Sequence, residues 1–364
     1  LKCWASELGV DGFRFDLGIA LSRGENLSPL DNPPIFEDIE CEPELIDIKF
    51  ISEPWDCGGL YKLGDFPSKN TFTWNGHFRD DLRRFWKGDK DTAWNMSDKI
   101  KGTPSIYKED TIFPKSINFI TSHDGFTLKD LVTFNRKHNF ANREQNRDGD
   151  NHNNSWNHGT EGPTTNLLIN DLRKRQQKNL ILSLLISKGV PMILMGDEIG
   201  RSQGGNNNSW CQNNLLGWMN WEHGQQDLEL LEYFKYVIKI RKKLINIFNP
   251  SFFPNNQTNE NIPTYHWHGT KLDSPDWSSW SHTVAFSINK GNTSPLVWIG
   301  LNAYSKSIDF PLPKCKYNWL KVIDTSMSEI FEPLTINEKS VSIKSRSSLL
   351  IISEEVFGAK NNLF

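Results

Sequence analysis

Four short apolar runs that each end on an acidic residue set the strongest limit on how this chain can fold. Helical or polar stretches separate the runs, and the spacing of apolar residues over Leu168–Lys188 predicts a long helix directly before the last one. This alternation favours a parallel sheet covered by helices. The four runs are Val10–Asp16, Ile46–Glu53, Ile117–Asp124 and Val190–Glu198.

The position of the acids favours one kind of parallel sheet, the (β/α) barrel. Barrel sites are built where the strands end, and each run carries its acid at that end. A doubly wound open sheet is the competing interpretation. No glycine-rich turn of the GxGxxG type follows any of the runs, which weakens that alternative. We therefore predict an α/β fold built on a (β/α)8 barrel.

The character of the sequence changes near residue 250. Asp227–Phe248 keeps apolar residues at helical spacing and predicts a closing helix. Beyond it, short apolar runs separated by Gly, Asn, Pro and Ser clusters predict an all-β domain. We expect residues 1–250 to belong to the barrel and residues 251–364 to form a C-terminal β-sandwich. The clearest β runs are Tyr265–His268, Thr283–Ile288 and Leu296–Leu301.

The composition excludes several classes of partner. The 364 residues include 41 Lys and Arg against 44 Asp and Glu, a net charge of −3 that gives no field to collect nucleic acid. No apolar run of about 18 residues occurs, so no membrane span is expected. The 14 Trp residues suit a neutral polysaccharide, because indole faces stack on sugar rings, although most of these aromatics are expected in the core.

The five cysteines have neither the spacing of a zinc site nor that of a disulfide framework. A reducing compartment is therefore expected, either the cytoplasm or a plastid stroma. Asp148–Asp150 resembles the start of a calcium loop but lacks the EF-hand ligand pattern, so a polar surface loop is the favoured interpretation. No metal site is predicted.

Three of the strand-end acids have the chemistry of a retaining glycosidase, which needs a carboxylate nucleophile and a protonatable acid about 5–5.5 Å apart. Arg14 lies two residues before Asp16, on the same face of the strand, where its charge and hydrogen bonds keep that carboxylate ionised. Glu53 precedes Pro54-Trp55 and has no basic neighbour in sequence, so an apolar setting would favour its protonated form.

The remaining acid, Asp124, follows His123 and could hold substrate hydroxyls or stabilise positive charge at the anomeric carbon. Each feature alone is weak, since an Arg-x-Asp pair is usually a structural ion pair. Ser122–Asp124 is not a serine triad either, because triad members meet in space rather than in sequence. Taken together, in this order and at strand ends, these features specifically indicate a retaining glycosidase.

At this point the chain resembles the α-amylase superfamily, glycoside hydrolase family 13. Three of its short signature regions look like Asp11–Asp16 (DGFRFD), Ile51–Asp56 (ISEPWD) and Phe119–Asp124 (FITSHD). The resemblance implies that Asp16 is the nucleophile, Glu53 the general acid/base and Asp124 the transition-state stabiliser. It also implies that Arg14 and His123 contact the substrate and the nucleophile, that no cofactor is needed, and that a β-sandwich follows the barrel.

Longer segments resemble the glycogen-debranching and isoamylase group of that family. Typical α-amylases carry Lys-His three and four residues after the nucleophile, whereas this chain has Ile19 and Ala20. The resemblance thus implies hydrolysis of α-1,6 branch linkages in glycogen, amylopectin or limit dextrins, with a branched α-glucan as substrate. The matching segments are Trp74–Gly88, Ser122–Val132, Asn135–Trp156, Gly189–Gln212, Pro275–Trp280 and Leu301–Tyr304.

The same resemblance places the signature acids on barrel strands four, five and seven. We therefore expect the chain to begin just before strand four, with only strands four to eight present. Five strands cannot close a barrel, so such a fragment is expected to be poorly soluble, partner-dependent or inactive. Two alternatives stay open: a hydrolase of pullulan or trehalose-capped maltooligosaccharides, and a non-catalytic glucan-binding or assembly subunit.

Overall fold

The computed structural model describes residues 1–107, 115–222, 224–248, 263–291, 293–328, 330 and 332–357. The chain divides into two compact units, which we describe separately. The first contains Leu1–Phe78, Gly102–Phe119 and Gly189–Met192, and the second contains Arg79–Lys101, Ile120–Lys188 and Ile193–Phe364. The expected boundary near residue 250 lies outside the described residues, so the division into 1–250 and 251–364 stays a prediction.

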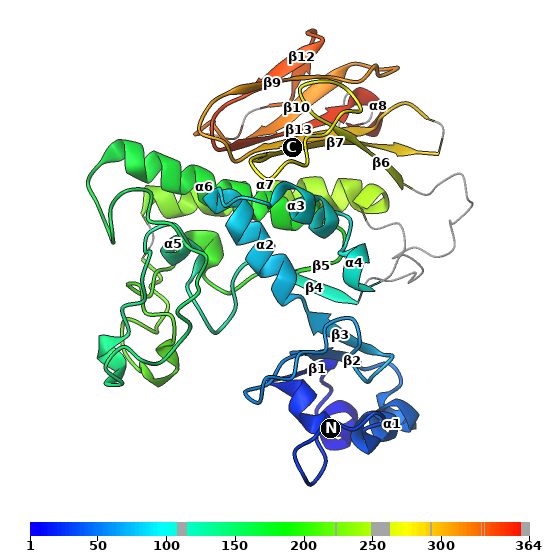
Figure 1. Ribbon diagram of the computed structural model, residues 1–364, viewed down its shortest axis with the longest axis vertical. Coiled ribbons are helices and arrows are strands. Elements are labelled where there is room, and N and C mark those ends of the chain that lie inside the picture. Colours follow the sequence, from blue (N-terminus) through cyan, green and yellow to red (C-terminus); the bar gives the residue numbers. More distant parts are fainter. Residues whose placement is uncertain are drawn as a thin grey trace. The chain divides into compact units, whose positions relative to one another are not determined.

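The first unit is built on a sheet of parallel strands that neighbour one another in chain order (Figure 1). A doubly wound sheet reverses its strand order at a switch point, and this sheet has no such reversal among its described strands. The predicted parallel α/β arrangement is confirmed. The strands are β1 (Gly12–Phe15), β2 (Lys49–Ser52), β3 (Thr71–Trp74), β4 (Ser116–Phe119) and β5 (Val190–Met192), with helices α1 (Pro34–Cys41) and α4 (Pro104–Tyr107) between them.

Four of these strands lie within the acid-tipped runs, and two details differ from expectation. Strand β3 was not predicted, because its four residues carry no acid and no long apolar run. Strand β5 ends at Met192, well before Glu198. The chain instead turns at Gly196, whose φ is 99°, and forms a short 3-10 helix at Asp197–Ile199.

The second unit contains two long helices at the predicted positions, and Figure 1 shows them lying side by side. The side chain of Asn166 caps the first of these helices by accepting a hydrogen bond from Leu168 N at 3.0 Å. Every residue from Gln176 to Ile186 is buried, so neighbours surround this half of the helix. The helices of the unit are α3 (Ala93–Ile100), α5 (Leu128–Leu131), α6 (Leu167–Ile186), α7 (Gln225–Phe248), α8 (Glu354–Phe357) and most of α2 (Gly76–Lys87).

The C-terminal part of this unit is all β, as predicted. Its antiparallel sheet has the order β11-β10-β13-β8-β7-β6, and β9 pairs with β12 in a smaller sheet. Trp298 and Ile351 of the larger sheet share one apolar cluster with Phe310 and Ile343 of the smaller sheet. The strands are β6 (Pro263–His268), β7 (Thr283–Lys290), β8 (Val297–Asn302), β9 (Ile308–Pro311), β10 (Trp319–Asp324), β11 (Leu334–Ile336), β12 (Ser340–Ile343) and β13 (Ser347–Ser353).

A buried amide joins α6 to the β strands. Asn179 Oδ1 accepts hydrogen bonds from Thr325 Oγ1 at 2.6 Å and from Ser348 Oγ at 2.9 Å. Its Nδ2 donates to the carbonyl oxygen of Arg346 at 2.9 Å and to Gln176 Oε1 at 2.8 Å. The buried amide therefore uses all four of its hydrogen-bonding positions, and three of these bonds fix α6 against the β strands. No helix within the described residues is both long and apolar enough to cross a bilayer.

We expect Asn179→Ala to lower the free energy of unfolding by about 2–4 kcal/mol, because it leaves buried hydroxyl and amide partners unpaired. Urea unfolding measures this. Asp171→Ala, at an exposed position on the same helix, is the control and should change stability by less than about 0.5 kcal/mol. An equal loss in both variants would contradict the role given to the amide.

Candidate functional site

Strands β1 and β2 bring two acids to adjacent strand ends. Phe15 is paired with Ser52, the last residue of β2, and each strand is followed directly by its acid, Asp16 or Glu53. The backbone continues this pairing, since Glu53 N donates to Phe15 O at 3.1 Å. The carboxylates of Asp16 and Glu53 have oxygens within 4.8 Å of each other. This spacing suits a retaining pair.

One guanidinium contacts both carboxylates. Arg14 Nη1 donates to Asp16 Oδ1 at 2.7 Å, and Arg14 Nη2 donates to Glu53 Oε1. The guanidinium carbon of Arg14 lies 4.2 Å from the ring centroid of Trp74, on β3. This cation–π contact helps to hold the guanidinium in place. From the sequence, Arg14 was expected to contact Asp16 alone, and Glu53 was expected to have no basic neighbour. The structure corrects this, because the parallel register brings the same cation to both acids.

The two acids differ in exposure. The Asp16 side chain is 61% exposed, whereas the Glu53 side chain is 4% exposed. Glu53 also uses its second oxygen, because Oε2 accepts a hydrogen bond from Leu17 N at 2.7 Å. Leu17 has a φ of 44°, in the left-handed region that non-glycine residues rarely adopt. A strained backbone position is thus held in place beside the acid pair.

Gly18 continues this tight turn and must be glycine. A Cβ at this position would lie 2.0 Å from Ser52 Oγ and 2.8 Å from the Phe15 Cβ. The chain after β1 therefore packs directly on the end of β2. This close approach orients Leu17 N toward Glu53.

A second ion pair holds the chain that follows Glu53. Arg23 binds both oxygens of Asp56, with Nε–Oδ2 at 2.6 Å and Nη2–Oδ1 at 3.1 Å. Asp56 Oδ1 also accepts hydrogen bonds from Gly58 N and Leu60 N, each at 2.9 Å. The Arg23 guanidinium, followed by these backbone hydrogen bonds, lowers the pKa of the Asp56 carboxyl to about 2 although its burial opposes the shift.

His123 and Asp124 lie in the second unit, beyond the end of β4. His123 Nε2 lies 3.6 Å from Asp124 Oδ2, and both side chains are exposed. Buried Arg83, on α2, holds the backbone just before them by donating from Nε to Ile120 O at 2.9 Å. Its Nη1 donates to Asn153 O at 3.0 Å. The structure thus brings Arg14, Asp16 and Glu53 together in one unit, and His123 and Asp124 together in the other.

Asp197 is a buried acid in the short helix after β5. Its Oδ2 accepts from Thr121 Oγ1, and its Oδ1 accepts from Leu128 N at 2.9 Å. Burial raises the pKa of Asp197 to about 7, and these hydrogen bonds only partly offset the effect. Asp197 therefore ties both sides of the segment that carries Asp124. The fourth acid-tipped run ends on the next residue, Glu198, so the role of Asp197 in positioning a loop was not predicted from the sequence.

The asparagine-rich segments form a buried network around Asn207. Its Oδ1 accepts from Asn139 Nδ2 and its Nδ2 donates to Asn153 Oδ1, both at 2.8 Å. Its carbonyl oxygen accepts from Gly125 N, the residue after Asp124, at 2.9 Å. The role of these segments was not predicted from the sequence. The sequence feature that could have indicated this network is the presence of three clusters of asparagines, because side-chain amides can pair their donors and acceptors with one another.

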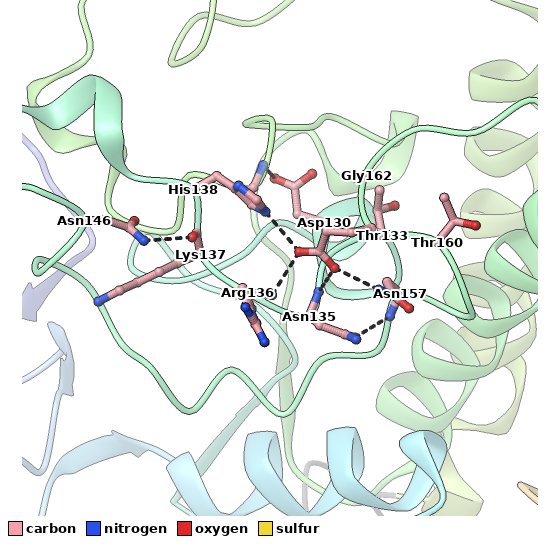
Figure 2. A network of polar contacts seen from close by, with 12 residues as sticks. Asp130, Thr133, Asn135, Arg136, Lys137, His138, Asn146, Asn157, Thr160 and Gly162 are labelled. Carbon is pink, nitrogen blue, oxygen red and sulfur yellow. Dashed lines mark hydrogen bonds and ion pairs between the residues drawn. The ribbon is translucent and has the colours of Figure 1, made fainter.

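Figure 2 shows a further carboxylate anchor in the same region, where donors from two segments converge. Glu161 accepts from Asn135 N at 2.8 Å, His138 Nε2 at 3.0 Å and Asn157 Nδ2 at 2.8 Å. Burial opposes ionisation of this carboxyl, but the hydrogen bonds prevail and lower the pKa of Glu161 to about 2. Hydrogen bonds to Glu161 therefore hold the two ends of the loop over residues 135–161 together.

Comparison with solved structures gives the class of fold. The pullulanase type I from Bacillus subtilis str. 168, solved in complex with maltose, superposes with a TM-score of 0.67. The match is 18% identical and covers 97% of this chain and 45% of the pullulanase chain. The chain therefore shares its fold with part of a pullulanase.

Sequence comparison finds relatives among isoamylases and glycogen debranching enzymes. The chain is 39% identical to isoamylase 1, chloroplastic, from Oryza sativa subsp. japonica, over 92% of this chain and 44% of the relative. It is 37% identical to the glycogen debranching enzyme of Erwinia tasmaniensis, over 87% of this chain and 47% of the relative. A family profile described as "Isoamylase 1-3, C-terminal" matches residues 266–355. The chain is thus similar to isoamylases and glycogen debranching enzymes over most of its own length, and it spans about half the length of these relatives.

The Asp56 ion pair makes a testable contribution to stability. Because the folded pKa lies below that of the unfolded chain, the contribution is complete above about pH 5 and declines as the pH falls through about 4 toward 2. We expect the stability gap between the wild type and Asp56→Asn to narrow over this range in urea unfolding. Asp47→Asn, at an exposed position in the same unit, is the control. A gap that stays constant with pH would argue against the ion pair.

Proposed function

We propose that this chain carries the catalytic carboxylates of a retaining hydrolase of α-1,6-glucosidic branch linkages. The observation that carries the proposal is the guanidinium of Arg14 shared between exposed Asp16 and buried Glu53 at adjacent strand ends. The finer fold assignment belongs to the same proposal: β1 to β5 are strands four to eight of a (β/α)8 barrel, and a β-sandwich domain follows at residues 251–364.

Asp16 is the nucleophile in this mechanism. It is the exposed member of the pair, and the Arg14 hydrogen bond at 2.7 Å keeps one oxygen oriented while the other attacks the anomeric carbon. The bond from that carbon to the bridging oxygen breaks as the bond to Asp16 forms. The product is a covalent glucosyl-enzyme with inverted configuration at that carbon.

Glu53 is the general acid and then the general base. Its proton passes to the bridging oxygen, which releases the chain that carried the branch point. In the second step the Glu53 carboxylate removes a proton from water, and the water oxygen displaces Asp16. Configuration is thereby retained overall. The structure has hydrogen-bond donors on both Glu53 oxygens, which is the environment of the carboxylate needed in the second step.

Asp124 and His123 complete the proposed set. Asp124 stabilises positive charge at the anomeric carbon in the transition state, and His123 contacts substrate hydroxyls. The substrate is a branched α-glucan such as glycogen, amylopectin or a limit dextrin. The five cysteines are all free, which fits a reducing cytoplasm or plastid stroma.

The first test is release of reducing ends from β-limit dextrin and from linear amylose by the protein that carries these 364 residues. We expect release from the branched substrate alone, lowered at least about 1,000-fold by Asp16→Asn, because the nucleophile is lost. Cleavage of amylose would point to an α-1,4 enzyme. Glucan binding without release from either substrate would favour the binding-subunit alternative.

The role of Glu53 has its own test. Glu53→Gln should slow hydrolysis of the branched substrate at least about 100-fold, because the leaving oxygen is no longer protonated. With α-maltosyl fluoride, whose leaving group needs no proton, the variant should release one burst of fluoride and then stall at the covalent intermediate. Asp16→Asn serves as the matched control and should give no burst. Steady turnover of the fluoride by Glu53→Gln would reject the general-base assignment.

A further inference from the structure

Two aromatic side chains in the second unit are exposed on short helical turns. Phe140, on η4 (Phe140–Asn142), is 69% exposed, and Trp210, on η6 (Ser209–Cys211), is 82% exposed. Trp221 and Trp280 of this unit are also exposed, at 78% and 72%, whereas Trp86 and Trp298 are buried. Single exposed rings are common on protein surfaces, whereas aromatic rings held close together often mark binding surfaces.

Hydrogen bonds join the two turns directly. Asn142, the last residue of the Phe140 turn, donates from Nδ2 to Asn208 O at 2.8 Å, just before the Trp210 turn. Its Oδ1 accepts from Gln212 Nε2 at 2.7 Å, just after that turn. One side chain therefore clamps both ends of the Trp210 turn. The positions of the two turns relative to each other are set by bonds within this unit.

The same turns are tied to the segment that carries Asp124. Asn207 directly precedes the segment that Asn142 holds and is buried, and its carbonyl oxygen accepts from Gly125 N at 2.9 Å. Asn207 N donates to Asn139 Oδ1, next to Phe140, at 2.9 Å. The backbone after Asp124 and both aromatic turns thus share one buried support. Such support lets exposed rings bind without a large ordering cost.

We propose that Phe140 and Trp210 form a stacking surface for an α-glucan chain next to the Asp124 segment. The inference rests on the proposed function and adds the residues that hold the polymer. The apolar faces of glucose rings stack on aromatic rings, while side-chain amides bond to sugar hydroxyls. Amides border this surface at Asn142, Gln212 and Asn214. Neutral amides beside aromatic rings suit an uncharged, hydroxyl-rich ligand.

The test measures glucan binding in the Asp16→Asn background, so that no substrate is consumed. Isothermal titration with β-limit dextrin should show that Phe140→Ala and Trp210→Ala each raise Kd about 5- to 30-fold. Trp210→Phe keeps an aromatic face and should stay within about threefold of the parent. Trp280→Ala removes an equally exposed indole, 72% exposed, from the loop before β7 and should leave Kd unchanged.

Kinetics in the otherwise active protein separate this inference from the proposed function. The alanine variants should raise KM for β-limit dextrin while kcat changes less than about twofold. Unchanged Kd and KM in an active enzyme would overturn the stacking surface and leave the proposed function standing. Loss of all activity in the parent would instead reject the function. Protection of Trp210 from acrylamide quenching without glucan would show that another segment covers the ring, and this result would also overturn the inference.

Discussion

The contact on which the candidate site most depends is the bridge from Arg14 to both Asp16 and Glu53. It exists only because β1 and β2 are parallel and in the register that pairs Phe15 with Ser52. A slip by one residue would turn Arg14 and Asp16 together to the opposite face of β1 and break the bond to Glu53. The acid pair is therefore a product of strand register, and the glycine at position 18 permits the close packing that keeps it.

Buried polar side chains perform the same task in the second unit. Asp197 and Asn207 each hold the segment around Asp124 from a different side, through Thr121, Leu128 and Gly125. Loops after strands carry the chemistry in folds of this kind, yet loops alone are mobile. Buried amides and carboxyls with satisfied hydrogen bonds restrict the motion of these loops. Hydrogen bonds are directional, whereas apolar packing would not orient the backbone in the same way. The position of the segment around Asp124 thus depends on buried polar side chains.

Sequence patterns predicted the elements whose signal is local. The long helices α6 and α7 follow from 3.6-residue spacing, and β1, β2 and β4 follow from apolar runs that end on acids. Strand β3 has no such signal in four residues. The Arg14–Glu53 bond could not be predicted by local pattern, because the partners lie 39 positions apart. The network around Asn207 was hidden for the same reason, since its members lie in three separate segments.

The contrast in exposure between the two acids supports their separate roles more strongly than their motifs do. Attack on an anomeric carbon needs an accessible carboxylate, and Asp16 is the exposed member. Proton transfer needs a carboxyl whose geometry stays fixed through two steps, and Glu53 is buried with a donor on each oxygen. Exchanging these roles would require the less accessible carboxylate to attack the anomeric carbon. The fold around Arg14 does not favour this exchange, so burial supports the proposed assignment alongside the family resemblance.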